Sequence, residues 1–134
     1  MNNAIAATMT TLLLALSLAG CGEEEKPAVC SSVTDLKASV ADVKKIDVES
    51  GNALADLTSG LKAVQSDLKS VKADAKSEYS SGLDAVETGL TSVKTSLEAA
   101  TATTDPTTLA AVGTALKALG TDVEALITDI QSTC

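Results

Sequence analysis

The sequence predicts an all-α protein, built as an elongated antiparallel helical bundle or coiled coil. Apolar residues recur at alternating spacings of three and four, which is the pattern of one helix face, whereas a strand would alternate every second residue. Tyr79 is the only aromatic residue. A core would therefore consist of Leu, Val, Ile and Ala, which suit closely packed helices.

Composition excludes several function classes. The formal charge is -8, and all positive side chains are lysines because Arg and His are absent. A nucleic-acid surface needs clustered positive charge, so nucleic acid is not expected as a partner. Histidine is the commonest general base and metal ligand near neutral pH, and no nucleophile–base pair, phosphate loop or metal cluster replaces it. We expect no catalytic residues, no metal and no cofactor, and hence no enzyme.

The first element is an apolar stretch, residues 4–19, that ends in small residues. It is shorter than the about 20 apolar residues of a spanning helix and is typical of a signal peptide. The quartet Leu18-Ala19-Gly20-Cys21 then resembles the lipobox of bacterial lipoproteins. That resemblance implies cleavage between Gly20 and Cys21 and lipid on Cys21. It also implies a place on the extracytoplasmic face of a bacterial membrane, at the cell surface or in the periplasm.

The second element is an acidic linker. Residues 21–29 contain three adjacent glutamates, one proline and no hydrophobic periodicity, so an extended conformation is expected. Adjacent carboxylates without spaced backbone ligands do not make a calcium site. The predicted organisation is a signal peptide at 1–20, a lipid-anchored linker at 21–29 and a helical extracytoplasmic domain at 30–134. One departure from the lipoprotein pattern is that residues 1–10 contain no Lys or Arg.

The helical domain begins with an apolar series that predicts a helix over residues 30–46. The turn-rich stretch 47–52 ends this helix. A second series then runs from Leu54 to Ala75 with regular heptad spacing.

A third apolar series follows from Tyr79 to Ala100. Between the second and third series the spacing is four and four, a stutter that a continuous helix can absorb. Asp105-Pro106 is a helix-start signal and predicts a last helix over residues 106–132.

Two architectures fit these series. In the first, residues 52–103 form one long central helix, and the flanking helices 30–46 and 106–132 fold back on it. In the second, a turn near 80–82 makes an up-down four-helix bundle.

The cysteines help to choose between the architectures. Apart from Cys21, the chain contains Cys30 and Cys134, and outside the cytoplasm such a pair is most simply a disulfide. With a long central helix the two would lie about 10 Å apart along its axis, whereas a reversal near residue 80 would separate them by about 25 Å. The sequence therefore favours the long central helix.

Two features stay open to more than one interpretation. The segment 59–64 (SGLKAV) resembles 81–86 (SGLDAV), and either a duplicated helical unit or convergent coiled-coil composition explains this. Tyr79 either fills the widened layer at the stutter or is a contact for a partner.

The function expected from the sequence is that of a membrane-anchored envelope lipoprotein acting as a structural spacer or protein-interaction module. Its partners would be the membrane, through the lipid, and an envelope protein or a second copy of the chain. The alternative is a small apolar ligand or lipid held between the helices.

Overall fold

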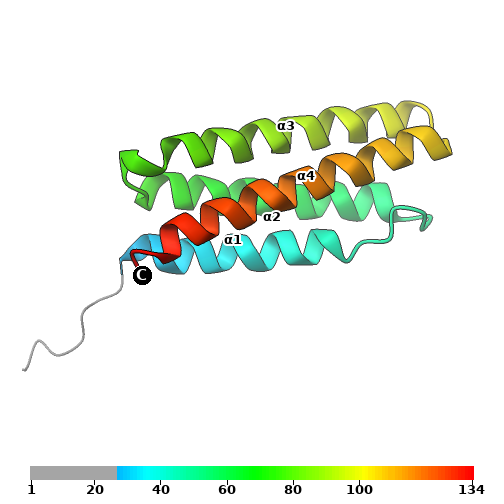
Figure 1. The fold of residues 1–134 in the computed structure, drawn as a ribbon. Helices are drawn as coiled ribbons and strands as arrows, with labels where there is room; N and C mark the ends of the chain where they lie inside the picture. The colour runs from blue at the N-terminus through cyan, green and yellow to red at the C-terminus, as the bar shows by residue number, and fades with distance from the viewer. Residues whose placement is uncertain (1–26) are drawn as a thin grey trace, which may run out of the picture.

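The computed structural model describes residues 27–134, and this part of the chain is an all-α bundle, as predicted; it contains four α-helices. Helix α1 spans Ala28–Lys44, α2 spans Ala53–Asp74, α3 spans Ser80–Ala102 and α4 spans Pro106–Gln131. A 3-10 turn, η1, covers Ser77–Tyr79. Successive helices run in opposite directions, so the start of α1 and the end of α4 lie at the same end of the bundle (Figure 1).

The helices form two hairpins that lie against each other. α1 packs along α2 and α3 packs along α4, and these are the most extensive contacts. α1 also contacts α4 over a shorter length, and of the four pairs of neighbouring helices α2 and α3 have the fewest contacts. The edge between α2 and α3 is therefore the least closely packed of the four.

The core follows the apolar series of the sequence. Almost all of their members are buried, and Leu54, Ala75 and Leu109, which lie at or just beyond helix ends, are partly buried. The heptad pattern thus predicts which residues face inward even where it does not predict the connections. The largest side chains with almost no exposed surface are Leu36, Leu57, Leu119, Leu126 and Ile130.

The predicted long central helix over residues 52–103 is wrong, and the alternative four-helix bundle is confirmed. Ala75 and Lys76 have extended backbone conformations, with ψ of 146° and 161°, and these break the helix. η1 then reverses the chain, so the break lies at residues 75–79 and not at 80–82. A reversal lets the apolar faces of α2 and α3 cover the same core as α1 and α4, which one straight helix could not do.

The large separation of Cys30 and Cys134 expected for a reversal near residue 80 is wrong, because Cys30 lies farther along α2 than expected. Helix α1 ends at Lys44, and the non-helical connection 45–52 spans part of the bundle's length. The start of α1 therefore reaches the end of α2, where the Ser32 hydroxyl donates to the Asp74 carboxylate at 2.6 Å. Cys30 consequently lies at the same end of the bundle as the C-terminal residues.

The start of α4 has the cap that the sequence predicted. The Asp105 carboxylate accepts hydrogen bonds from the backbone N–H groups of Thr107 and Thr108 at 2.8 and 2.9 Å. The Thr108 hydroxyl in turn accepts one from the Asp105 N–H, and Pro106 occupies the first helical position. These bonds satisfy donors that a helix start otherwise leaves free.

Candidate functional site

The residues expected to carry the membrane anchor lie outside the described residues. Gly20, Cys21 and the apolar stretch before them all precede residue 27. Lipidation and cleavage therefore stay predictions from the sequence. Among residues 27–134, no helix has both the length and the apolar character needed to cross a membrane.

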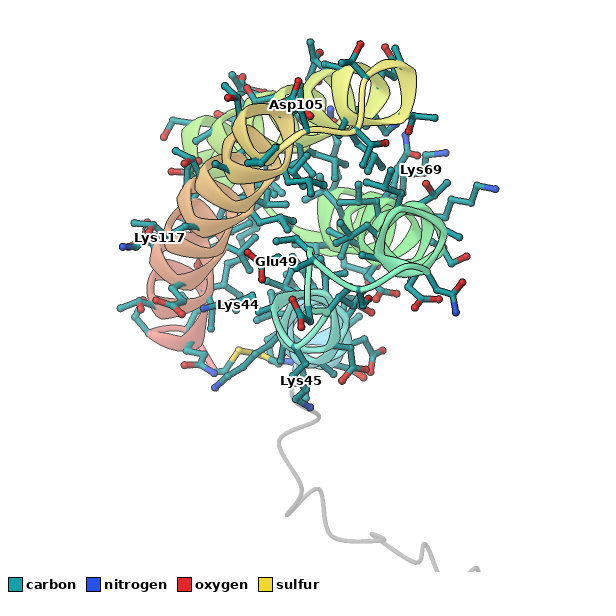
Figure 2. All side chains as sticks on the ribbon, turned by 90° about the vertical axis from the view of Figure 1, so that its right-hand side faces the viewer. Lys44, Lys45, Glu49, Lys69, Asp105 and Lys117 are labelled. Carbon is teal, nitrogen blue, oxygen red and sulfur yellow. A yellow bond between two sulfur atoms is a disulfide. The ribbon has the colours of Figure 1, made fainter. Side chains whose placement is uncertain are left out.

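The disulfide expected between Cys30 and Cys134 is present. The sulfur atoms are 2.02 Å apart, and the Cα atoms are 5.9 Å apart. The bond joins the start of α1 to the chain end after α4, and it is visible in yellow beside these two helices in Figure 2. It thus links residues that are 104 positions apart in the sequence.

Tyr79 lies in the core at this same end of the bundle. Its side chain is 9% exposed, and its hydroxyl donates to Oγ1 of Thr133 at 3.1 Å. Of the two roles considered for Tyr79, this position agrees with a side chain that fills a core layer. The ring is not available at the surface as a contact for a partner.

An open groove runs along the edge between α2 and α3. Its wider part has a volume of about 580 Å³, with Leu61 and Leu97 at its floor. A narrower part of about 290 Å³ continues toward η1, over Leu68 and Leu90. The polar residues of its two walls are Thr58, Lys62, Gln65, Lys69, Glu87, Thr91, Lys94, Glu98 and Thr101.

Two polar contacts join the walls of this groove. Lys94 Nζ donates to Gln65 Oε1 at 3.2 Å, and both residues line both parts of the groove. Nearer η1, Lys72 Nζ lies 2.8 Å from Glu87 Oε1. The hydrogen bond and the negative charge of Glu87 raise the pKa of Lys72.

The groove has a surplus of positive charge on an acidic chain. Lys62 and Lys69 on α2 and Lys94 on α3 line it. Figure 2 shows Lys69 projecting on the side where α2 and α3 face each other. Against these stand Glu98 and Glu87, and Glu87 is already paired with Lys72. The chain as a whole carries a formal charge of -8.

Two carboxylates of α2 accept hydrogen bonds from serines of α1. Ser39 donates a hydrogen bond to the Asp67 carboxylate, and Ser32 donates to Asp74. No histidine lies beside these serines to activate them as nucleophiles. The two pairs are therefore interpreted as hydrogen bonds that join α1 to α2. Within the described bundle, no group of three or more Cys, Asp or Glu residues is placed to hold a metal ion.

The groove between α2 and α3 is not predicted by the sequence. From the sequence, its lysines and carboxylates are typical of a solvent-exposed helix surface. Hydrophobic periodicity predicts which residues face outward, but it does not predict which neighbouring helices are separated by a groove. The only available signal was the seven-residue spacing of Lys62 and Lys69, which puts both on one side of α2.

Comparison with known proteins gives no relatives. The chain matches no protein-family model, no curated protein and no solved structure.

Proposed function

We propose that this chain is a lipid-anchored module of the bacterial cell envelope, and that its helical bundle is a protein-interaction module without catalytic activity. The anchor is inferred from the lipobox at Leu18-Ala19-Gly20-Cys21. The interaction surface is inferred from the groove between α2 and α3. The open, positively lined groove is the observation that carries this proposal.

The geometry of the chain ends supports such an arrangement. The chain enters the bundle at Pro27, beside the disulfide. The wider part of the groove lies toward the opposite end, near the start of α2 and the end of α3. At 1.5 Å per residue, α2 is about 33 Å long. A lipid on Cys21 would thus hold one end near the membrane and place the wider part of the groove away from it.

Intact mass spectrometry of the full-length protein, expressed in a bacterium and extracted from its membranes, tests the anchor. We expect a chain that starts at Cys21 and carries diacylglycerol, with two further cysteines that alkylate only after reduction. The Cys21→Ser variant is the control and should carry no lipid. A wild-type protein of unlipidated mass would contradict the anchored-module proposal.

A second candidate function is the binding of a small apolar ligand. The volume of the groove, about 580 Å³ in its wider part, falls within the range of small-molecule sites. An organic extract of the purified protein would be analysed by mass spectrometry. A stoichiometric co-purified lipid would favour this function, and an extract without one would count against it.

A further inference from the structure

We propose that the groove between α2 and α3 binds an amphipathic helix of a partner protein, one that carries carboxylates beside its apolar stripe. This inference rests on the proposed interaction function and names the chemistry of the partner. The packing of the bundle's edges, the shape of the groove and its charge support this inference.

Glycines and hydrogen bonds close the other three edges of the bundle. A Cβ on Gly60 of α2 would lie 2.6 Å from Val43 of α1, so these helices are in close contact. Gly82 and Gly89 of α3 lie similarly against α4. Gly120 of α4 lies against the Lys44 side chain of α1. Between α2 and α3 long side chains also join the walls, but here they span an open groove, so this edge has room for an occupant.

The shape of the groove suits a helix. Along α2 the lining residues follow the spacing of one helical face from Thr58 to Lys69, which is about 16 Å or three turns at 1.5 Å per residue. On α3 the lining residues run along the helix from Glu87 to Ala102. A straight channel between two helices accepts a third helix through apolar anchors at positions i, i+3 or i+4, and i+7.

Its mixed polarity also favours a helix over a bare acyl chain. The floor leucines Leu61 and Leu97 are only 2% and 7% exposed, and polar side chains form the walls. Protein interfaces combine an apolar centre with a polar rim in this way. An acyl chain would make no hydrogen bond or ion pair with these polar groups.

The positive charge of the groove determines which kind of partner helix it would bind. Lys62, Lys69 and Lys94 attract carboxylates on a partner, and electrostatic complementarity of this kind gives specificity. A second copy of this chain is not favoured, because docking two grooves face to face would oppose lysines with lysines. Each copy would also bring a net charge of -8.

Peptide binding to the lipidated protein in phosphatidylcholine nanodiscs tests the proposal. The probe is a fluorescent 21-residue helical peptide, about three heptads, with leucines on one stripe and glutamates beside it. A matched peptide has lysines in place of the glutamates. Anisotropy should show at least about tenfold tighter binding of the glutamate peptide, after subtraction of empty nanodiscs, and this preference should decrease as salt is raised.

Matched charge reversals locate the site. The groove variant is Lys62→Glu with Lys69→Glu, and the control is Lys37→Glu with Lys117→Glu, on exposed positions of α1 and α4. Both variants change the net charge equally. We expect the groove variant to bind the glutamate peptide at least about tenfold more weakly and the control to change by less than about twofold.

Several results would overturn the proposal. These are no binding of the glutamate peptide, equal binding of both peptides, or equal weakening by the two double variants. Displacement of the peptide by palmitate, at palmitate concentrations that leave empty nanodiscs unchanged, would assign the groove to a lipid instead. Lipidated protein that does not bind peptide would reject the groove inference alone, whereas unlipidated protein that does bind would reject the anchor.

Discussion

Individual glycines decide how closely the helices of each hairpin approach. Gly60 of α2 lies against the buried Val43 of α1, and a Cβ there would meet Val43 Cγ2 at 2.6 Å. Gly113 of α4 has open space around it, with no such neighbour within 4 Å. The same substitution at these two positions therefore has opposite consequences.

We expect Gly60→Ala to lower the free energy of unfolding by about 1 kcal/mol. Valine is stiff at χ1, so overpacking costs about 1–3 kcal/mol and outweighs the gain of up to about 1 kcal/mol in helix propensity. Gly113→Ala is the control and should raise the free energy of unfolding by about 0.5–1 kcal/mol. Urea denaturation followed by circular dichroism measures both. Stabilisation by both substitutions would show that Val43 moves aside freely.

Tyr79 also makes a single hydrogen bond that can be tested separately from its packing. Tyr79→Phe keeps the buried ring but removes the donor to Thr133, so we expect a loss of about 1 kcal/mol. Thr133→Val removes the other partner. If the bond matters, the double variant should cost clearly less than the sum of the two single variants in thermal unfolding. Strict additivity would contradict a coupled pair.

At the scale of elements, the start of α4 depends on one side chain. Asp105 accepts from two backbone N–H groups, so Asp105→Ala should lower the free energy of unfolding by about 1 kcal/mol. Asp129→Ala removes a carboxylate of equal charge from an exposed position near the other end of α4 and should cost less than about 0.5 kcal/mol. Urea unfolding midpoints compare the two. Similar losses would indicate a general charge effect instead of a cap.

Some of the helices and connections are predicted by the sequence, and others are not. The inward faces, the connection before α2 and the cap of α4 follow from spacing and from turn residues. The break at 75–79 does not, because Ala75, Lys76 and Ser77 include neither Gly nor Pro and all tolerate a helix. The only sequence signal at this break is the change to a four-and-four spacing of apolar residues around Tyr79. The groove was missed because the separation of α2 and α3 is set by packing of the whole bundle.

The similar segments 59–64 and 81–86 also share a structural feature. Gly60 and Gly82 occupy equivalent places in the two segments. Each lies where its helix meets the other helix of its own hairpin, against Val43 and Leu126 respectively. The glycine shared by the two segments therefore has the same packing role in each hairpin.

For the whole molecule, the disulfide is the largest single contribution to stability that the structure identifies. Closing a loop of this length contributes up to about 4–5 kcal/mol in the chain-entropy model. Cys30→Ser with Cys134→Ser should therefore unfold at much lower urea concentration than the oxidised protein. Dithiothreitol should shift the wild type toward the variant and leave the variant unchanged. A wild type insensitive to the reductant would contradict this role.

The same bond also determines what happens when the backbone is cut. A protease that cleaves once in the connection 45–52, or once in the short connection 103–105, produces two pieces. One piece contains Cys30 and the other contains Cys134, so the disulfide keeps them covalently joined. Under oxidising conditions a nicked bundle stays attached to the segment that precedes Pro27, and its release needs a second cut or a reductant.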